Sequence, residues 1–441
     1  MVELKFKEEN FMSKKKRYVQ VGLGGRARMF YFAIADKYSE TSELTAFCDL
    51  NRTRMELAAK LMKEKFDYPT PEFYGADEFE KMIEEQKPDV VIVTTIDRTH
   101  HKYIIKAMEM GCDVISEKPM TIDADKCQEI IDTIKRTGKN LRVTFNYRYA
   151  PYHTKVRELI KSGVIGDVKQ VHFEWMLNTE HGADYFRRWH RDKRNSGGLL
   201  VHKSTHHFDL VNFWLGTKPK EVFAYGDLLF YGRANAESRG ETKFYYRGTG
   251  SEIAKNDKFA MDLGCSEYLR DLYLNAEHED GYLRDQSVFG DCISIEDVMN
   301  VVVKYETGAT MSYSLNAFSP KEGFNVSFTG TKGRIEMFVT EQSYVNAGGD
   351  GSQEGAIKDK YVRVYPMFEP WYEVEVETIE GGHGGGDTVL LEDIFGENPP
   401  YDPLHRAASY EDGAMSILTG IAANKSIAAN MPIKIKDLVQ F

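Results

Sequence analysis

The chain has 441 residues, of which 42% are hydrophobic and 28% are charged, and its formal net charge at pH 7 is −11. This composition is typical of a globular protein with about two domains, each long enough for its own core. The acidic balance argues against a nucleic-acid partner and against binding to an anionic membrane surface. The five cysteines are scattered, with no Cys-x-x-Cys pair, which favours reduced thiols and a cytoplasmic protein.

Residues 1–16 read as a charged leader that lacks the apolar core of a signal peptide, and a dinucleotide-binding domain is expected over 17–147. An apolar strand at 18–21 runs into a Gly-x-Gly-x-x-Ala sequence, and a helical stretch follows. In such a turn the first glycine permits the tight bend, the second lets a pyrophosphate approach, and the alanine allows close packing. The helix N-terminus then faces the phosphates. The residues expected to bind the cofactor here are Gly22, Gly24, Gly25, Arg26 and Ala27.

Strands and helices alternate after this turn, which predicts an α/β fold with a doubly wound parallel sheet. Asp49 ends the second strand, where a carboxylate accepts the adenosine ribose hydroxyls and repels a 2′-phosphate, so NAD is expected rather than NADP. Arg54 lies nearby and weakens that preference, and it is included among the cofactor-binding residues. The expected set is completed by Thr94, Thr95, His100, Glu117, Lys118 and Asn146. The further strands are predicted at 44–48, 89–94, 113–116 and 141–145, and the helices at 57–65, 79–86, 99–110 and 124–137.

Residues 196–209, Ser-Gly-Gly-Leu-Leu-Val-His-Lys-Ser-Thr-His-His-Phe-Asp, carry the most chemical information. If the segment is helical, His202, His206 and Asp209 share one face. Two imidazoles and a carboxylate suit proton transfer or metal binding. The metal interpretation lacks the glutamate of His-Glu-x-x-His and a third ligand nearby, so no metal is expected. A helix start whose histidines serve only packing is the alternative interpretation of this segment.

The glycine-rich turn, the tripeptide Glu117-Lys118-Pro119 and the Gly-Gly…His-x-x-x-His-x-x-Asp segment follow one another in this order. With them the chain resembles, over nearly its whole length, the glucose–fructose oxidoreductase / inositol dehydrogenase / rhizopine-catabolism (Gfo/Idh/MocA) family. The resemblance implies that Glu117 contacts the nicotinamide ribose and that Lys118 reaches the substrate hydroxyl. It also implies a cis peptide before Pro119.

Two histidines are expected to join Lys118 as catalytic residues. His206 fits a general base because imidazole titrates near neutral pH. In the family the residue four positions earlier is usually Asp, whereas here it is His202. A second imidazole cannot neutralise a charged His206, so the two would share a proton or both contact substrate. A carboxylate partner would then have to come from Asp209, Asp184 or a later insertion.

The second domain, 148–441, is expected to be an α+β unit with an open, mainly antiparallel sheet and an insertion at about 226–291. Its predicted elements are helices at 152–161 and 409–424 and strands at 166–178, 298–305, 309–316, 325–329 and 334–338. A broad open sheet favours a homodimer or homotetramer. The expected substrate-binding residues are Arg148, Trp189, His190, Lys203, Asp209, Tyr282 and His383, with Arg284 and Asp285 as further candidates for sugar contacts. His383 is surrounded by five glycines, which indicates a backbone held close to a ligand.

The sequence therefore predicts an NAD-dependent oxidoreductase for a secondary hydroxyl of a sugar, glycoside or cyclitol. The predicted partner is this small polyhydroxylated molecule, with no nucleic acid and no membrane. Two alternatives stay open: a glycoside hydrolase that uses NAD for transient oxidation and elimination, and a non-catalytic sugar sensor on the same scaffold.

Overall fold

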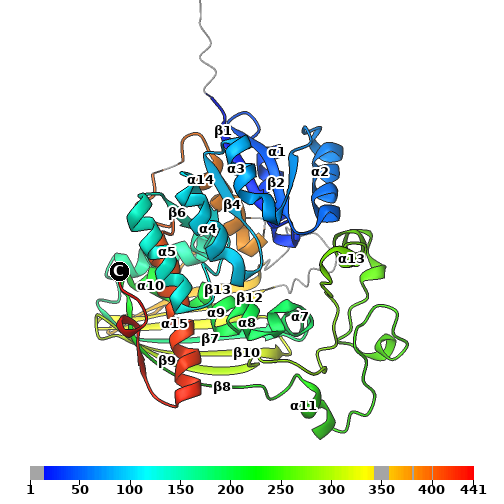
Figure 1. Cartoon of the computed structure of the whole chain (residues 1–441). Helices are drawn as coiled ribbons and strands as arrows, with labels where there is room; N and C mark the ends of the chain where they lie inside the picture. The colour runs from blue at the N-terminus through cyan, green and yellow to red at the C-terminus, as the bar shows by residue number, and fades with distance from the viewer. Residues whose placement is uncertain (1–13, 342–356, 380–381, 400) are drawn as a thin grey trace, which may run out of the picture.

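The computed structural model describes residues 14–341, 357–379, 382–399 and 401–441, and the chain folds around two sheets (Figure 1). The predicted leader lies outside the described residues for 1–13, and the first strand begins at Lys16. Among the described residues, no helix is both long enough and apolar enough to span a bilayer.

The first sheet has six parallel strands in the order β3-β2-β1-β4-β5-β6, which confirms the doubly wound prediction. Its strands are β1 (Lys16–Val21), β2 (Ser42–Asp49), β3 (Glu72–Gly75), β4 (Val90–Val93), β5 (Asp113–Ser116) and β6 (Leu141–Val143). The helices between them are α1 (Arg28–Ala35), α2 (Arg52–Phe66), α3 (Phe79–Gln86), α4 (His100–Glu109) and α5 (Ala124–Thr137). The strand order reverses between β1 and β4, so a crevice opens outside their carboxyl ends.

The second sheet has nine strands in the order β14-β13-β12-β11-β7-β10-β9-β8-β15. Its pairs are antiparallel except β7 with β10, as expected for a mainly antiparallel sheet. Buried and exposed side chains alternate along β9 and β12, so one face of the sheet packs against a core. The strands are β7 (Val168–Asn178), β8 (Pro219–Asp227), β9 (Val298–Tyr305), β10 (Thr310–Ser319), β11 (Gly323–Gly330), β12 (Gly333–Glu341), β13 (Ile357–Pro366), β14 (Tyr372–Glu373) and β15 (Ile433–Lys434).

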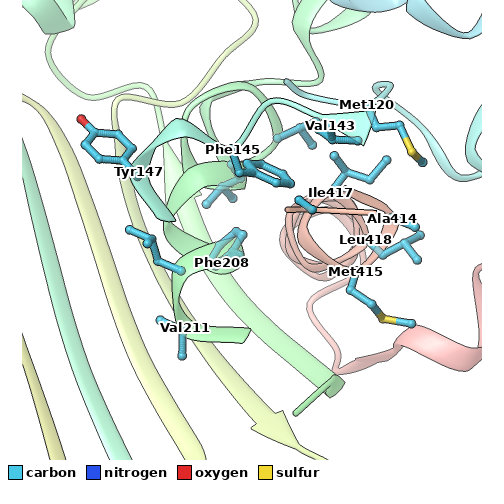
Figure 2. Close-up of a cluster of buried hydrophobic side chains, with 14 of the residues drawn as sticks. Met120, Val143, Phe145, Tyr147, Phe208, Val211, Ala414, Met415, Ile417 and Leu418 are labelled. Carbon is cyan, nitrogen blue, oxygen red and sulfur yellow. The ribbon is translucent and has the colours of Figure 1, made fainter. Parts of the chain in front are cut away.

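Helix α15 (Tyr410–Ala429) contacts β6 and α5 of the first domain as well as α10 (Ser204–Leu215) and β8 of the second, and Figure 2 shows part of the buried cluster around it. Its side chains Ala414, Met415, Ile417 and Leu418 belong to one buried cluster with Val143 of β6 and Phe208 of α10. Two glycines permit this close approach. A Cβ at Gly413 would lie 2.7 Å from the Val143 side chain, and one at Gly420 would lie 2.1 Å from the Leu200 carbonyl oxygen. The helix thereby fixes the histidine-rich segment beside the edge of the parallel sheet.

The insertion leaves the second sheet after β8 and returns at β9. Its helix α13 (Glu277–Asp280) lies beside α2 of the first domain (Figure 1). The Glu279 carboxylate accepts hydrogen bonds from the backbone N–H groups of Arg52 and Thr53, and Asn51 Nδ2 donates to the Ala276 carbonyl at 2.8 Å. The insertion therefore caps the helix that follows Asp49.

Candidate active site

A single cavity of about 1080 Å³ runs along the carboxyl edge of the parallel sheet. One end is lined by the glycine-rich turn, Asp49 and Arg54. The other end is lined by Lys118 and by ten residues of the second domain: His181, Asp184, Tyr185, Arg188, Trp189, His190, Asn195, His202, Lys203 and His206. A crevice at this edge is where nucleotides bind in open α/β sheets.

The glycine-rich turn forms an open cradle. Gly22 has a φ of +88°, and a Cβ there would lie 2.6 Å from the Thr95 backbone nitrogen, so a side chain cannot fit. The Thr94 hydroxyl donates to the Gly22 carbonyl at 2.6 Å and ties the turn to β4. A Cβ at Gly24 would meet no atom within 4 Å, which leaves free space on the cavity side. Gly25 and Arg26 line the cavity, whereas Ala27 is fully buried in packing. This turn fits a dinucleotide pyrophosphate.

Asp49 and Arg54 lie together at the adenosine end. Both Asp49 oxygens accept backbone N–H bonds, from Leu23 at 2.5 Å and Asn51 at 2.8 Å, and burial raises the pKa of this carboxyl. Arg54 is turned toward the insertion: its Nε donates to the Leu272 carbonyl at 3.1 Å, and its Nη1 lies 2.5 Å from Asp280 Oδ2. Asp280, which the sequence did not single out, therefore neutralises the arginine beside Asp49.

A charged network connects the two domains around Asp387. Arg26 donates to Glu117 at 2.9 Å and to Asp387 at 2.8 Å, and His383 Nδ1 lies 2.9 Å from the same aspartate. Although burial alone would raise it, Arg26 and His383 hold the pKa of Asp387 well below its usual value. Asn146 Nδ2 also donates to Asp387, at 2.7 Å. Asn146 does not line the cavity, so its predicted contact with the cofactor is corrected to support of this network.

Lys118 lies at the junction of the two ends of the cavity. Its peptide bond to Pro119 is cis, and its Nζ is 3.5 Å from the His202 carbonyl oxygen. Burial lowers the pKa of Lys118 to about 8, Lys203 acts in the same direction, and Glu117 opposes them. His100 supports this turn, because its ring nitrogens lie 2.8 Å from the Pro119 carbonyl and 2.9 Å from the Thr95 carbonyl.

The carboxylate partner of the histidines is Asp97, which follows β4 and was not predicted. His202 Nδ1 lies 2.5 Å from Asp97 Oδ2. Burial raises the pKa of Asp97 and lowers the pKa of His202, so desolvation disfavours the charged form of each partner in this hydrogen bond. Within the described part of the chain, His206 has no such partner: its Nδ1 is buried without a hydrogen bond, which leaves Nε2 as the ring nitrogen that can reach a substrate. Burial, followed by Lys118 and Lys203, lowers the pKa of His206 well below its usual value.

Asp209, Asp184 and Arg148 are placed differently from the prediction. Lys203, between α9 (Leu199–His202) and α10, keeps right-handed helical dihedral angles, with φ −91° and ψ −49°, so the backbone alone does not separate His202 from Asp209. Asp209 instead holds Arg148 through bonds of 2.7 and 2.5 Å, away from the cavity lining. Asp184 lines the cavity but is paired with Arg284 at 2.7 Å. The substrate contacts predicted for Arg148 and Asp209 are therefore corrected to a buried ion pair.

The remaining predicted side chains surround the substrate end. Trp189, His190, Lys203, Tyr282 and His383 all line the cavity. Two of the glycines after His383 are required by protein packing, since a Cβ at Gly384 would lie 2.7 Å from the Tyr152 ring and one at Gly386 would lie 2.4 Å from the Asn146 carbonyl oxygen, whereas Gly382 lines the cavity. Arg284 and Asp285 are buried outside the lining. The cavity also contains Asp97, Asp280, Asp387 and Arg188, which were not assigned from the sequence.

Comparison with known proteins identifies the family. Residues 16–145 match the oxidoreductase family with an NAD-binding Rossmann fold, and residues 157–435 match its C-terminal alpha/beta domain. The chain is 37% identical over 434 residues to the putative oxidoreductase YteT of Bacillus subtilis, covering 96% of this chain and 99% of that protein. It is 28% identical over 392 residues to glycosyl hydrolase family 109 protein 1 of Akkermansia muciniphila, covering 86% of this chain and 72% of that protein.

Solved structures show the same fold. The WlbA dehydrogenase from Bordetella pertussis, in complex with NADH and UDP-GlcNAcA, superposes with a TM-score of 0.61 at 17% identity, covering 96% of this chain and 99% of that one. Taken with the glycine-rich turn, the cis Lys118–Pro119 peptide and the matches over both domains, these similarities confirm the predicted resemblance: the chain belongs to the Gfo/Idh/MocA family of oxidoreductases.

Proposed function

We propose that the protein is an NAD-dependent oxidoreductase that moves a hydride between the cofactor and the carbon of a secondary hydroxyl or ketone on a sugar, glycoside or cyclitol. The observation that carries this proposal is the position of Lys118, where the cofactor end of the cavity meets the histidine-lined end. Bound NAD would accept the hydride of the alcohol.

The proton of that alcohol goes to a side chain of the protein. With its pKa lowered to about 8, Lys118 is partly neutral near physiological pH and takes the hydroxyl proton during oxidation. As an ammonium it returns the proton during reduction. His202, oriented by Asp97, and His206, through Nε2, accept or donate hydrogen bonds to neighbouring substrate hydroxyls.

The proposed preference for NAD rests on the adenosine end. This preference is supported by the Asp49 carboxylate at the end of β2, which would repel a 2′-phosphate, and by Asp280, which pairs with the Arg54 guanidinium that could otherwise bind one. A spectrophotometric assay with NAD and NADP, run against sugars, inositols and glycosides, tests the proposal. No NADH formation from any of them, with Lys118→Ala binding ligand as the parent does, would contradict it.

A second candidate function is NAD-dependent glycoside hydrolysis by transient oxidation and elimination. It is favoured by the similarity to a glycosyl hydrolase family 109 protein over 86% of this chain. Aryl glycosides distinguish the two, because a hydrolase releases the aglycone with a tightly held cofactor and no net NADH. A dehydrogenase gives NADH without aglycone release.

A further inference from the structure

The substrate end of the cavity carries positive charge that the protein itself does not balance. Its carboxylates are all engaged: Asp97 by His202, Glu117 and Asp387 by Arg26, and Asp184 by three arginines. Among the described residues, no carboxylate lies within ion-pair distance of Lys118 or Lys203. Lys118 has a role in proton transfer, but the charge of Lys203 has no such explanation.

Lys203 is buried in an aromatic setting. It is 4% exposed, and its Nζ lies 5.1 Å from the centre of the Trp175 ring and 5.7 Å from that of Tyr147. These rings attract a cation but do not take the place of acceptors for its three N–H donors, and among the described residues no hydrogen-bond acceptor lies within bonding distance of Lys203 Nζ. A buried ammonium without an anionic partner is unfavourable. Lys203 lines the cavity, so an anion bound in the cavity could pair with its ammonium group.

Arg188, the residue that follows helix α7 (His181–Arg187), adds a second positive charge to this end of the cavity. Asp184 is shared by Arg187, Arg188 and Arg284, so one carboxylate serves three guanidinium groups. Arg188 lines the cavity, and its Nε is buried without a hydrogen-bond partner. An anion in the cavity would supply the acceptors that both Arg188 and Lys203 lack.

We propose that the substrate is an acidic sugar, a uronate or a glycoside of one, whose carboxylate binds at Lys203 and Arg188. This inference rests on the proposed function and names its substrate class. A single carboxylate suits the site, because Lys203 contributes one full charge and the charge of Arg188 is partly balanced by Asp184. The hydroxyl to be oxidised then lies toward Lys118, and the carboxylate orients the ring relative to it.

The test uses full-length protein loaded with NADH and sets of methyl glycosides that differ only at C6. In both the gluco and the galacto series, the C6 group is a carboxylate, a hydroxymethyl group or a phosphate ester. Ligand binding is measured by calorimetry, and turnover is measured with NAD. We expect the better uronate to bind at least about tenfold tighter than its neutral counterpart, as a charge-assisted contact requires.

Lys203→Met should weaken uronate binding by at least about tenfold more than neutral-sugar binding, and Lys203→Arg should retain the uronate preference. Lys220→Met removes an exposed lysine of β8 and serves as the matched control. Three outcomes would overturn the inference. The neutral sugars could bind as tightly as the uronates or more tightly, or the phosphate esters could bind more tightly than the uronates. Lys203→Met could also weaken the binding of neutral and acidic sugars equally. Uronate binding without NADH formation would leave it standing and contradict the proposed function. Oxidation of neutral and acidic sugars with equal efficiency would contradict the inferred preference for acidic sugars and leave the proposed function standing.

Discussion

Replacement of Asp97 by asparagine tests whether the aspartate–histidine pair operates in the reaction. The substitution keeps the shape of the side chain but removes the charge that faces His202 Nδ1 at 2.5 Å. A hydrogen bond to a charged group contributes about 1.5–3 kcal/mol, so loss of the charge should lower kcat/KM by roughly 10- to 150-fold. The variant is assayed for NADH formation with the best substrate found.

The pH profile separates a direct role of Asp97 from a general loss of structure. The charge of Asp97 raises the pKa of Lys118, so in Asp97→Asn the inflection of kcat/KM should move below its parent position near pH 8. Asp132→Asn, on the exposed side of α5, is the control and should match the parent. A kcat/KM within twofold of the parent, together with an unmoved inflection, would refute the assignment of Asp97 to the site.

Three further predictions concern other parts of the cavity and its support. Oxidation by the parent protein should accelerate as the pH rises through about 8, since burial favours the neutral amine of Lys118. The Lys118→Met variant should lose at least about 100-fold in kcat while still binding NADH, as measured by fluorescence. If its residual rate showed the same pH inflection as the parent, the role of Lys118 in proton transfer would be contradicted. Asp280→Asn frees Arg54 and should lower the ratio of the NADPH dissociation constant to the NADH dissociation constant, both measured by calorimetry. An unchanged ratio would show that Asp280 does not set the cofactor preference. Arg148→Met leaves Asp209 without its arginine and should lower the free energy of unfolding, measured in urea, by about 3–5 kcal/mol. Most of this loss should be recovered when Asp209 is also replaced by leucine. If the double variant showed no recovery, the ion pair would not be the cause of the loss.

Local patterns in the sequence were sufficient to predict most of the first domain. Helices α3 and α5 begin and end where the periodicity places them, because each has a clear apolar face and a left-handed residue after its end. Strand β3 was not predicted, since Glu72–Gly75 is short and carries only one fully buried side chain. It forms because it pairs with β2, which no local pattern reveals.

The contacts between domains could not be predicted in the same way. Arg26 and Asp387 are 361 residues apart, and they meet because α14 (Gly386–Phe395) returns to the first domain. Nothing in the sequence of the insertion indicates that Glu279 caps α2. Such pairings depend on how the two domains pack.

The choice of the wrong carboxylate for the histidines has a specific physical cause. Helical spacing predicts that Asp209 lies near His202, but it does not reveal that Arg148, from another element, binds both Asp209 oxygens. Asp97, in contrast, lies four residues beyond the end of β4, at the edge where the carboxyl ends of parallel strands meet. The rule that ligands bind at this edge had already selected Thr94, Thr95 and Glu117. Applied to the whole loop after β4, it also selects Asp97, so the first domain supplies the charge that the usual aspartate of the second domain would have supplied.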